Sequence, residues 1–97
     1  MSGDAVIERS VQIVNRLGMH ARPAAEFVKL ASRFRADVRV EKEGLEVDGK
    51  SIMGVLMLAA EQGSQLTIRA EGHDAEAALA ALCELVDGGF HEAYEEY

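Results

Sequence analysis

The 97-residue sequence has little of several residue types that would point to particular classes of protein. It contains a single cysteine, so no internal disulfide can form, and a reducing cytoplasm is the expected compartment. No apolar run approaches the roughly 20 residues of a membrane helix, so we expect no membrane insertion. The first residues lack the basic and apolar regions of a secretory signal, which also favours a cytoplasmic protein.

The charge is acidic overall but unevenly distributed, with a net value of −7. Residues 1–42 hold eight Lys and Arg against five Asp and Glu, whereas residues 43–97 hold two against twelve. A nucleic-acid-binding protein needs a basic surface to neutralise phosphates, and the overall balance argues against one. A locally basic region around the first helix and a solvated acidic helix in the second half both remain open as explanations.

Strand-like and helix-like segments alternate along the chain. Period-two apolar patterns predict four strands, which fall within residues 5–15, in two pieces of 36–50, and within 64–72. Helical spacing predicts helices in residues 23–34, 51–63 and 73–89. Ser51 and Asp74 are the expected N-caps, and Gly63 and the Gly88-Gly89 pair the expected helix ends.

The order βαββαβα predicts an α+β fold of the open-faced sandwich type. Its four-stranded, mostly antiparallel sheet would be covered on one face by three helices. We expect one domain over residues 1–97, with a core at about 6–87 and an acidic tail at 88–97 to which we assign no role. Cys83 fits a core thiol, while His73 and His91 lack the neighbouring ligands of a metal site.

The only proline follows a histidine closely, in the stretch GMHARPAAEF. Pro23 suits the first turn of a helix, because its φ is fixed and its missing N–H has no partner there anyway. His20 therefore lies at a helix start, where unpaired N–H groups and the helix dipole favour anions such as phosphate. Arg22 adds a planar set of donors that matches phosphate oxygens. On these residues alone, a solvated histidine beside a helix start is the simpler interpretation.

Two segments, HARPAAEFVKLAS and GKSIMGVLMLAAEQGSQLTIRAEG, resemble the HPr family. These are the histidine-containing phosphocarrier proteins of the bacterial phosphoenolpyruvate-dependent phosphotransferase system. The resemblance runs in order from about Val6 to Val86, and the order of strands and helices agrees. It implies a phosphoryl carrier rather than an enzyme, and we expect a monomer without a cofactor or metal.

The resemblance also implies roles for the residues around the histidine. His20 would accept a phosphoryl group through Nδ1 from phosphorylated enzyme I and pass it to a histidine of an enzyme IIA-type protein. Arg22 matches the family's phosphate-binding arginine. Ala21 and Arg22 would supply backbone donors to the phosphate.

The stretch GKSIMGVLML is apolar at nearly every position after its serine. An apolar surface that remains after one side has packed is typical of a docking site, and Ile52 and Met53 are expected to face outward. An N-cap is an adequate structural explanation of Ser51. By resemblance, however, Ser51 matches the serine that HPr kinase/phosphorylase phosphorylates. The residues that match the family's partner-docking surface are Ala25, Ile52, Met53 and Leu56.

Two hypotheses of function follow from these residues. In the first, the protein is a phosphocarrier that uses His20, either in sugar uptake or in a regulatory phosphorelay such as a nitrogen-related branch. In the second, it is an interaction module controlled through Ser51. The combination of His20, Arg22 and Pro23 favours the first.

Overall fold

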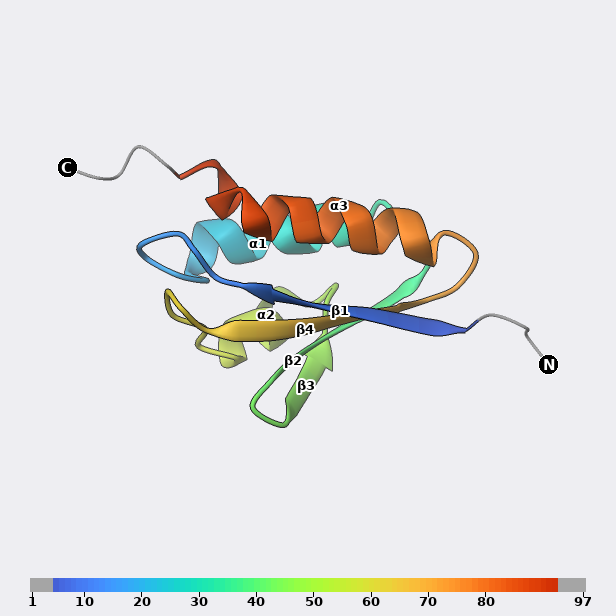
Figure 1. The fold of residues 1–97 in the computed structure, drawn as a ribbon, viewed down its shortest axis with the longest axis horizontal. Coiled ribbons are helices and arrows are strands. Elements are labelled where there is room, and N and C mark those ends of the chain that lie inside the picture. Colours follow the sequence, from blue (N-terminus) through green and yellow to red (C-terminus); the bar gives the residue numbers. More distant parts are fainter. Residues whose placement is uncertain (1–4, 93–97) are drawn as a thin grey trace.

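The computed structural model describes residues 5–92 and contains one four-stranded sheet with the order β1-β4-β2-β3. All three strand pairs are antiparallel. Figure 1 shows α1 and α3 side by side on one face of this sheet, which confirms the predicted open-faced sandwich. The elements, in chain order, are β1 (Val6–Gln12), α1 (Ala21–Ala31), β2 (Asp37–Lys42), β3 (Leu45–Asp48), α2 (Ile52–Met57), β4 (Gln65–Glu71), α3 (Ala75–Asp87) and the 3₁₀ turn η1 (Gly89–His91).

The two faces of the sheet differ because side chains alternate along each strand. On the open face, Arg69 lies 2.7 Å from Glu8, 2.7 Å from Glu41 and 2.9 Å from Glu46, so one guanidinium links three strands. The helix-facing side is apolar. Its buried strand residues are Val11, Val38, Val40, Val47, Leu66, Ile68 and Ala70.

Helices α1 and α3 cover this apolar side with the stripes that their sequences predict. The buried residues are Pro23, Ala24, Phe27 and Ala31 of α1, and Ala75, Ala78, Leu79, Leu82, Cys83, Leu85 and Val86 of α3. Burying a Phe or Leu side chain fully contributes about 1.5–3 kcal/mol. The helices run in opposite directions, so the C-terminal end of α3 lies beside the N-terminal end of α1 (Figure 1). None of the helices within residues 5–92 has both the length and the apolar character needed to cross a membrane.

The expectation that Gly63 ends the second helix is wrong. Helix α2 ends at Met57, with Leu58 as its C-cap, so Gly63 does not end it. The chain instead leaves the helix through Ala59, which has a φ of 48°. Gly63 has a φ of 92° and donates its N–H to the carbonyl of Ile13 at 2.7 Å, in the turn that leads into β4.

Asp74 occupies the N-cap position of α3, but its side chain makes no capping hydrogen bond. Its carboxylate accepts hydrogen bonds from the backbone N–H groups of Arg35, at 2.9 Å, and Ala36, at 2.8 Å. The hydrogen bond from Arg35 is the largest influence on the pKa of Asp74, and it lowers that pKa. The bond from Ala36 also lowers it, whereas burial opposes the shift. Asp74 therefore fastens the start of α3 to the segment before β2, whereas Ser51 caps α2 as predicted, through the N–H of Gly54 at 3.0 Å.

A glycine is required at one point in the loop between β1 and α1. Gly18 has a φ of 71°, and a Cβ atom there would lie 2.5 Å from the carbonyl oxygen of Ala60. The next residue, Met19, donates its N–H to that same oxygen at 2.8 Å. This contact holds the loop against the segment after α2 and so places the start of α1.

We predict that Gly18→Ala destabilises the protein by roughly 3 kcal/mol, because strained backbone and a clash with the Ala60 carbonyl act together. Gly44→Ala is the matched control. Gly44 also has a positive φ, of 89°, but a Cβ atom there would have nothing within 4 Å of it. That control incurs only the backbone strain of about 1–2 kcal/mol. Urea unfolding measures the stability of both variants. Equal losses of stability in Gly18→Ala and Gly44→Ala would contradict the importance of the Gly18–Ala60 contact.

Candidate functional site

His20 is the residue that precedes helix α1, as its distance from Pro23 predicts. Its backbone is extended, with φ −82° and ψ −169°, and its carbonyl accepts the N–H of Ala24 at 3.0 Å. Pro23 is buried in the first turn. The His20 side chain makes no capping hydrogen bond and keeps an exposed fraction of 38%. The imidazole is therefore held at the helix start but remains accessible to a partner.

The side chains of His20 and Arg22 meet at the carboxylate of Glu92. Glu92 Oε2 lies 3.0 Å from His20 Nε2 and also accepts a hydrogen bond from Arg22 Nη2. The same Arg22 nitrogen lies 3.3 Å from the carbonyl of Phe90, and Nη1 donates to Glu26 at 2.6 Å. Arg22 is therefore held in place by groups from α1 and from the segment after α3.

The Glu92 side chain is only 5% exposed, yet both of its oxygens have partners. Asn15 Nδ2 donates to Glu92 Oε1 at 3.0 Å and to the carbonyl of Gly18 at 2.8 Å. Burial by itself raises the pKa of Glu92. The hydrogen bonds from Asn15 and Arg22 and the nearby positive charges lower it by more, so the net shift of the pKa is downward. Burial lowers the pKa of Arg22, but Glu92 and Glu26 more than offset this and raise it. The site thus holds an ionised carboxylate against a charged guanidinium.

Glu92 reaches the site through a tight turn after α3. Gly89, Phe90 and His91 all have positive φ, of 68°, 56° and 60°. The Phe90 side chain is 0% exposed, so it anchors this turn in the core. Sequence reasoning placed these residues in the acidic tail and missed both Glu92 and Asn15. A large aromatic residue directly after a glycine pair was the available signal that the chain packs here; residues 93–97 of that tail lie outside the described part.

The predicted docking residues differ in exposure. Met53 is 71% and Ile52 44% exposed, as expected, and Ala25 on α1 is exposed as well. Leu56 is half-buried and packs against the core. Other exposed apolar residues were missed, among them Met57 at the end of α2 and Leu17 in the loop before His20.

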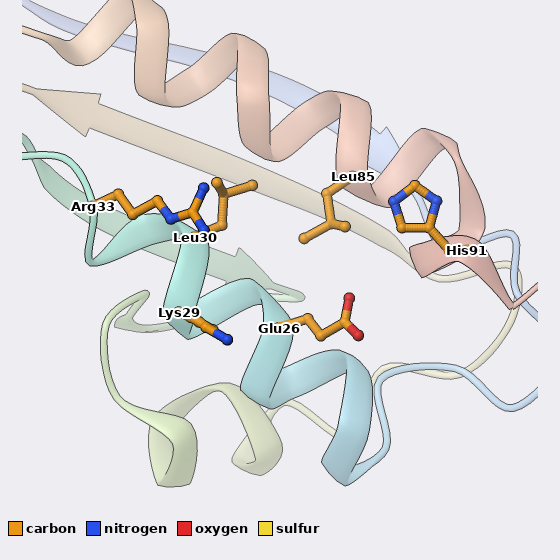
Figure 2. A pocket seen from close by; sticks show the side chains of 6 residues that line it. All are labelled: Glu26, Lys29, Leu30, Arg33, Leu85 and His91. Carbon is orange, nitrogen blue, oxygen red and sulfur yellow. The ribbon is translucent and has the colours of Figure 1, made fainter.

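A shallow hollow of about 340 Å³ lies between α1 and the C-terminal end of α3. Figure 2 shows the residues that line it: Glu26, Lys29, Leu30 and Arg33 from α1, Leu85 from α3 and His91 from η1. Neither His20 nor Arg22 lines this hollow. It touches the candidate site only through Glu26, the second partner of Arg22, so this hollow does not enclose the His20 ring.

Comparison with known proteins identifies the family. A family model described as the phosphorylation site of the HPr component of the phosphotransferase system matches residues 7–87. The chain belongs to the HPr family. The phosphocarrier protein HPr of Neisseria meningitidis serogroup A is 41% identical over 87 residues, which cover 90% of this chain and 98% of that protein. The phosphocarrier protein NPr of Shewanella violacea is 42% identical, over 90% of this chain and 96% of that protein.

A solved HPr structure supports the same family membership. The crystal structure of HPr from Bacillus anthracis matches with a TM-score of 0.82 and 50% identity, over 84% of this chain and 98% of that one. Proteins of the HPr family are phosphocarriers of the phosphotransferase system, and this general phosphocarrier role applies to the chain. They carry a phosphoryl group rather than catalyse a reaction.

We predict that the carboxylate of Glu92 stabilises the fold in a pH-dependent way. Since the folded-state pKa of Glu92 is lower than its ordinary value of 4.5, its contribution is present above that value and is lost as the pH falls through the native pKa. Glu92→Gln should therefore be less stable than the parent at about pH 7 and should approach it below about pH 3.

Urea unfolding at both pH values measures the difference. Glu84→Gln, a change at an exposed residue of α3, is the control. Its stability should differ little from that of the parent at either pH. An equal deficit of Glu92→Gln at both pH values would show that ionisation of Glu92 does not stabilise the folded protein.

Proposed function

We propose that His20 accepts a phosphoryl group from phosphorylated enzyme I and passes it to a histidine of an enzyme IIA-type protein. The chain acts as a stoichiometric carrier, without a cofactor or metal, as one HPr-like domain over residues 1–97. A cytoplasmic, monomeric protein fits this role, and both properties stay predictions. Relatives named HPr and NPr match equally well, so sugar uptake and a regulatory relay remain the two settings.

The observation that carries the proposal is the accessible His20 ring at the start of α1, with Arg22 held against the same carboxylate. Helix geometry leaves the N–H groups of Ala21 and Arg22 without intrahelical acceptors, while Pro23 has no N–H to leave unpaired. These donors, the helix dipole and the guanidinium all favour a phosphoryl group on His20.

The apolar residues around α2 support a docking surface for both partners. Ile52, Met53 and Ala25 are exposed, and α1 packs against α2, so these residues belong to neighbouring elements. Leu56 is half-buried and would contribute at the edge of such a surface. Exposed methionine suits contacts with more than one partner, because its flexible side chain adapts to different shapes.

Ser51 is proposed as a regulatory phosphorylation site for HPr kinase/phosphorylase. Its side chain is half-buried and accepts the N–H of Gly54, which places it directly before Ile52 and Met53. A phosphate there would add roughly −1.5 to −2 charges beside the apolar surface, at a helix end whose dipole accommodates them. The expected effect is weaker docking of an acidic partner without unfolding of α2.

We predict that His20→Ala abolishes phosphorylation by phosphoenolpyruvate and enzyme I. Intact mass and ³¹P NMR should show one acid-labile phosphoryl group on the parent and none on the variant. Stability should change by only about 1 kcal/mol or less, because the half-exposed His20 leaves Glu92 still paired with Asn15 and Arg22.

His73→Ala is the matched control, since His73 is exposed in the loop before α3, and it should be phosphorylated normally. A parent protein that takes no phosphoryl group from any enzyme I tested would refute the carrier role and favour the interaction module controlled by Ser51.

We predict that Ser51→Asp slows transfer from enzyme I to His20 by about tenfold, which corresponds to roughly 1.4 kcal/mol of repulsion at the docking surface. Ser10→Asp adds the same charge on the exposed side of β1 and should leave the rate nearly unchanged. Rapid-quench kinetics with radiolabelled phosphoenolpyruvate measures the rates. If both variants transfer at the parent rate, the regulatory role of Ser51 is wrong.

A further inference from the structure

We propose that Glu92 is a positioning residue for His20, which holds the ring proton on Nε2 and directs phosphoryl transfer to Nδ1. This inference rests on the proposed role of His20 as the phosphoryl acceptor. It assigns a task to a side chain beyond residues 7–87, which are the residues that the family model matches.

The chemistry of the contact decides where the proton lies. Glu92 Oε2 and His20 Nε2 are 3.0 Å apart, within hydrogen-bond distance. An ionised carboxylate has only acceptors, so a hydrogen bond between these atoms requires the proton on Nε2. In the neutral imidazole, the second nitrogen, Nδ1, then carries the free electron pair. The contact therefore selects the nitrogen that can attack phosphorus.

The carboxylate is held rigidly enough to perform this task. Its Oε1 accepts from Asn15, its Oε2 accepts from Arg22, and the side chain is nearly buried. The buried Phe90 and the left-handed turn at Gly89–His91 fix the backbone that carries it. A carboxylate on a flexible tail would lose conformational entropy whenever it bound His20. The carboxylate of Glu92 is already held in place, so it avoids that cost.

The transfer step balances without removal of a proton. The electron pair of His20 Nδ1 forms a new N–P bond while the N–P bond of the donor phosphohistidine breaks, and that electron pair returns to the donor nitrogen. The product ring of His20 carries phosphorus on Nδ1 and hydrogen on Nε2, and it is cationic. Glu92 stabilises that positive charge, as the aspartate of a Ser-His-Asp triad does for its imidazolium. In the onward step the ring then leaves as a neutral imidazole, which is a better leaving group than its anion.

Glu26 provides the matched control for this role. It also binds Arg22, at 2.6 Å, but no contact joins it to His20 within the described residues. Glu26→Ala therefore removes a carboxylate from Arg22 while it leaves the His20 ring untouched. Glu92→Ala removes a carboxylate from both Arg22 and His20.

The first measurement is ¹⁵N and ¹H NMR of the His20 ring in the unphosphorylated parent protein. We expect a proton on Nε2 that exchanges slowly with water, and the same signal in Glu26→Ala. In Glu92→Ala this proton should exchange rapidly. A parent spectrum with the ring proton on Nδ1 would overturn the proposal without any variant, so the conclusion does not depend on whether Glu92→Ala folds.

The second measurement is the rate of phosphoryl transfer from enzyme I to His20 and onward to an enzyme IIA-type protein. Loss of a charge-assisted hydrogen bond to the ring should slow Glu92→Ala by about tenfold or more in both steps. Thermal unfolding confirms that the variant is folded. Parent-like rates and parent-like proton exchange in a folded Glu92→Ala would overturn the proposal. If the parent itself takes no phosphoryl group, the proposed function fails, whereas the ring proton still reports on the Glu92 contact.

Discussion

The buried carboxylate of Glu92 joins three separate segments of this molecule. A charge removed from water must be paired and hydrogen-bonded, because an unpaired one costs several kcal/mol. Glu92 meets that condition with donors from the loop before α1, from α1 itself and from the histidine that precedes it. Removing any one of these partners would leave the carboxylate less well satisfied. The loop, the helix start and the turn after α3 are therefore coupled through one side chain.

The same constraint suits a carrier, which must release its phosphoryl group as readily as it accepts it. Arg22 is already neutralised by two carboxylates, those of Glu26 and Glu92. A phosphoryl group on His20 would therefore meet a guanidinium whose positive charge is already balanced in part by these carboxylates, beside a ring that is 38% exposed to water. Both conditions limit how strongly the phosphorylated state is stabilised, since electrostatic attraction is weak in a high-dielectric environment.

The two sides of the fold are suited to different surroundings. The open face of the sheet carries Arg69 among three glutamates and is well solvated. The side around α1 and α2 exposes Ile52, Met53 and Met57. Exposed apolar side chains of this kind are what the proposed docking surface requires.

The sequence by itself determined the strands and helices of the α+β fold, the helix start near Pro23 and the cap at Ser51, since each of these depends on residues close together in the chain. It also pointed to His20 and Arg22. Only the tertiary structure decided that Asp74 binds the segment before β2, that Gly63 belongs to the turn before β4, and that Glu92 lies against His20. Asn15 and Glu92 are 77 residues apart, and no local pattern links them. Local preferences are readable from a sequence, whereas a buried ion pair exists only once packing has brought its partners together.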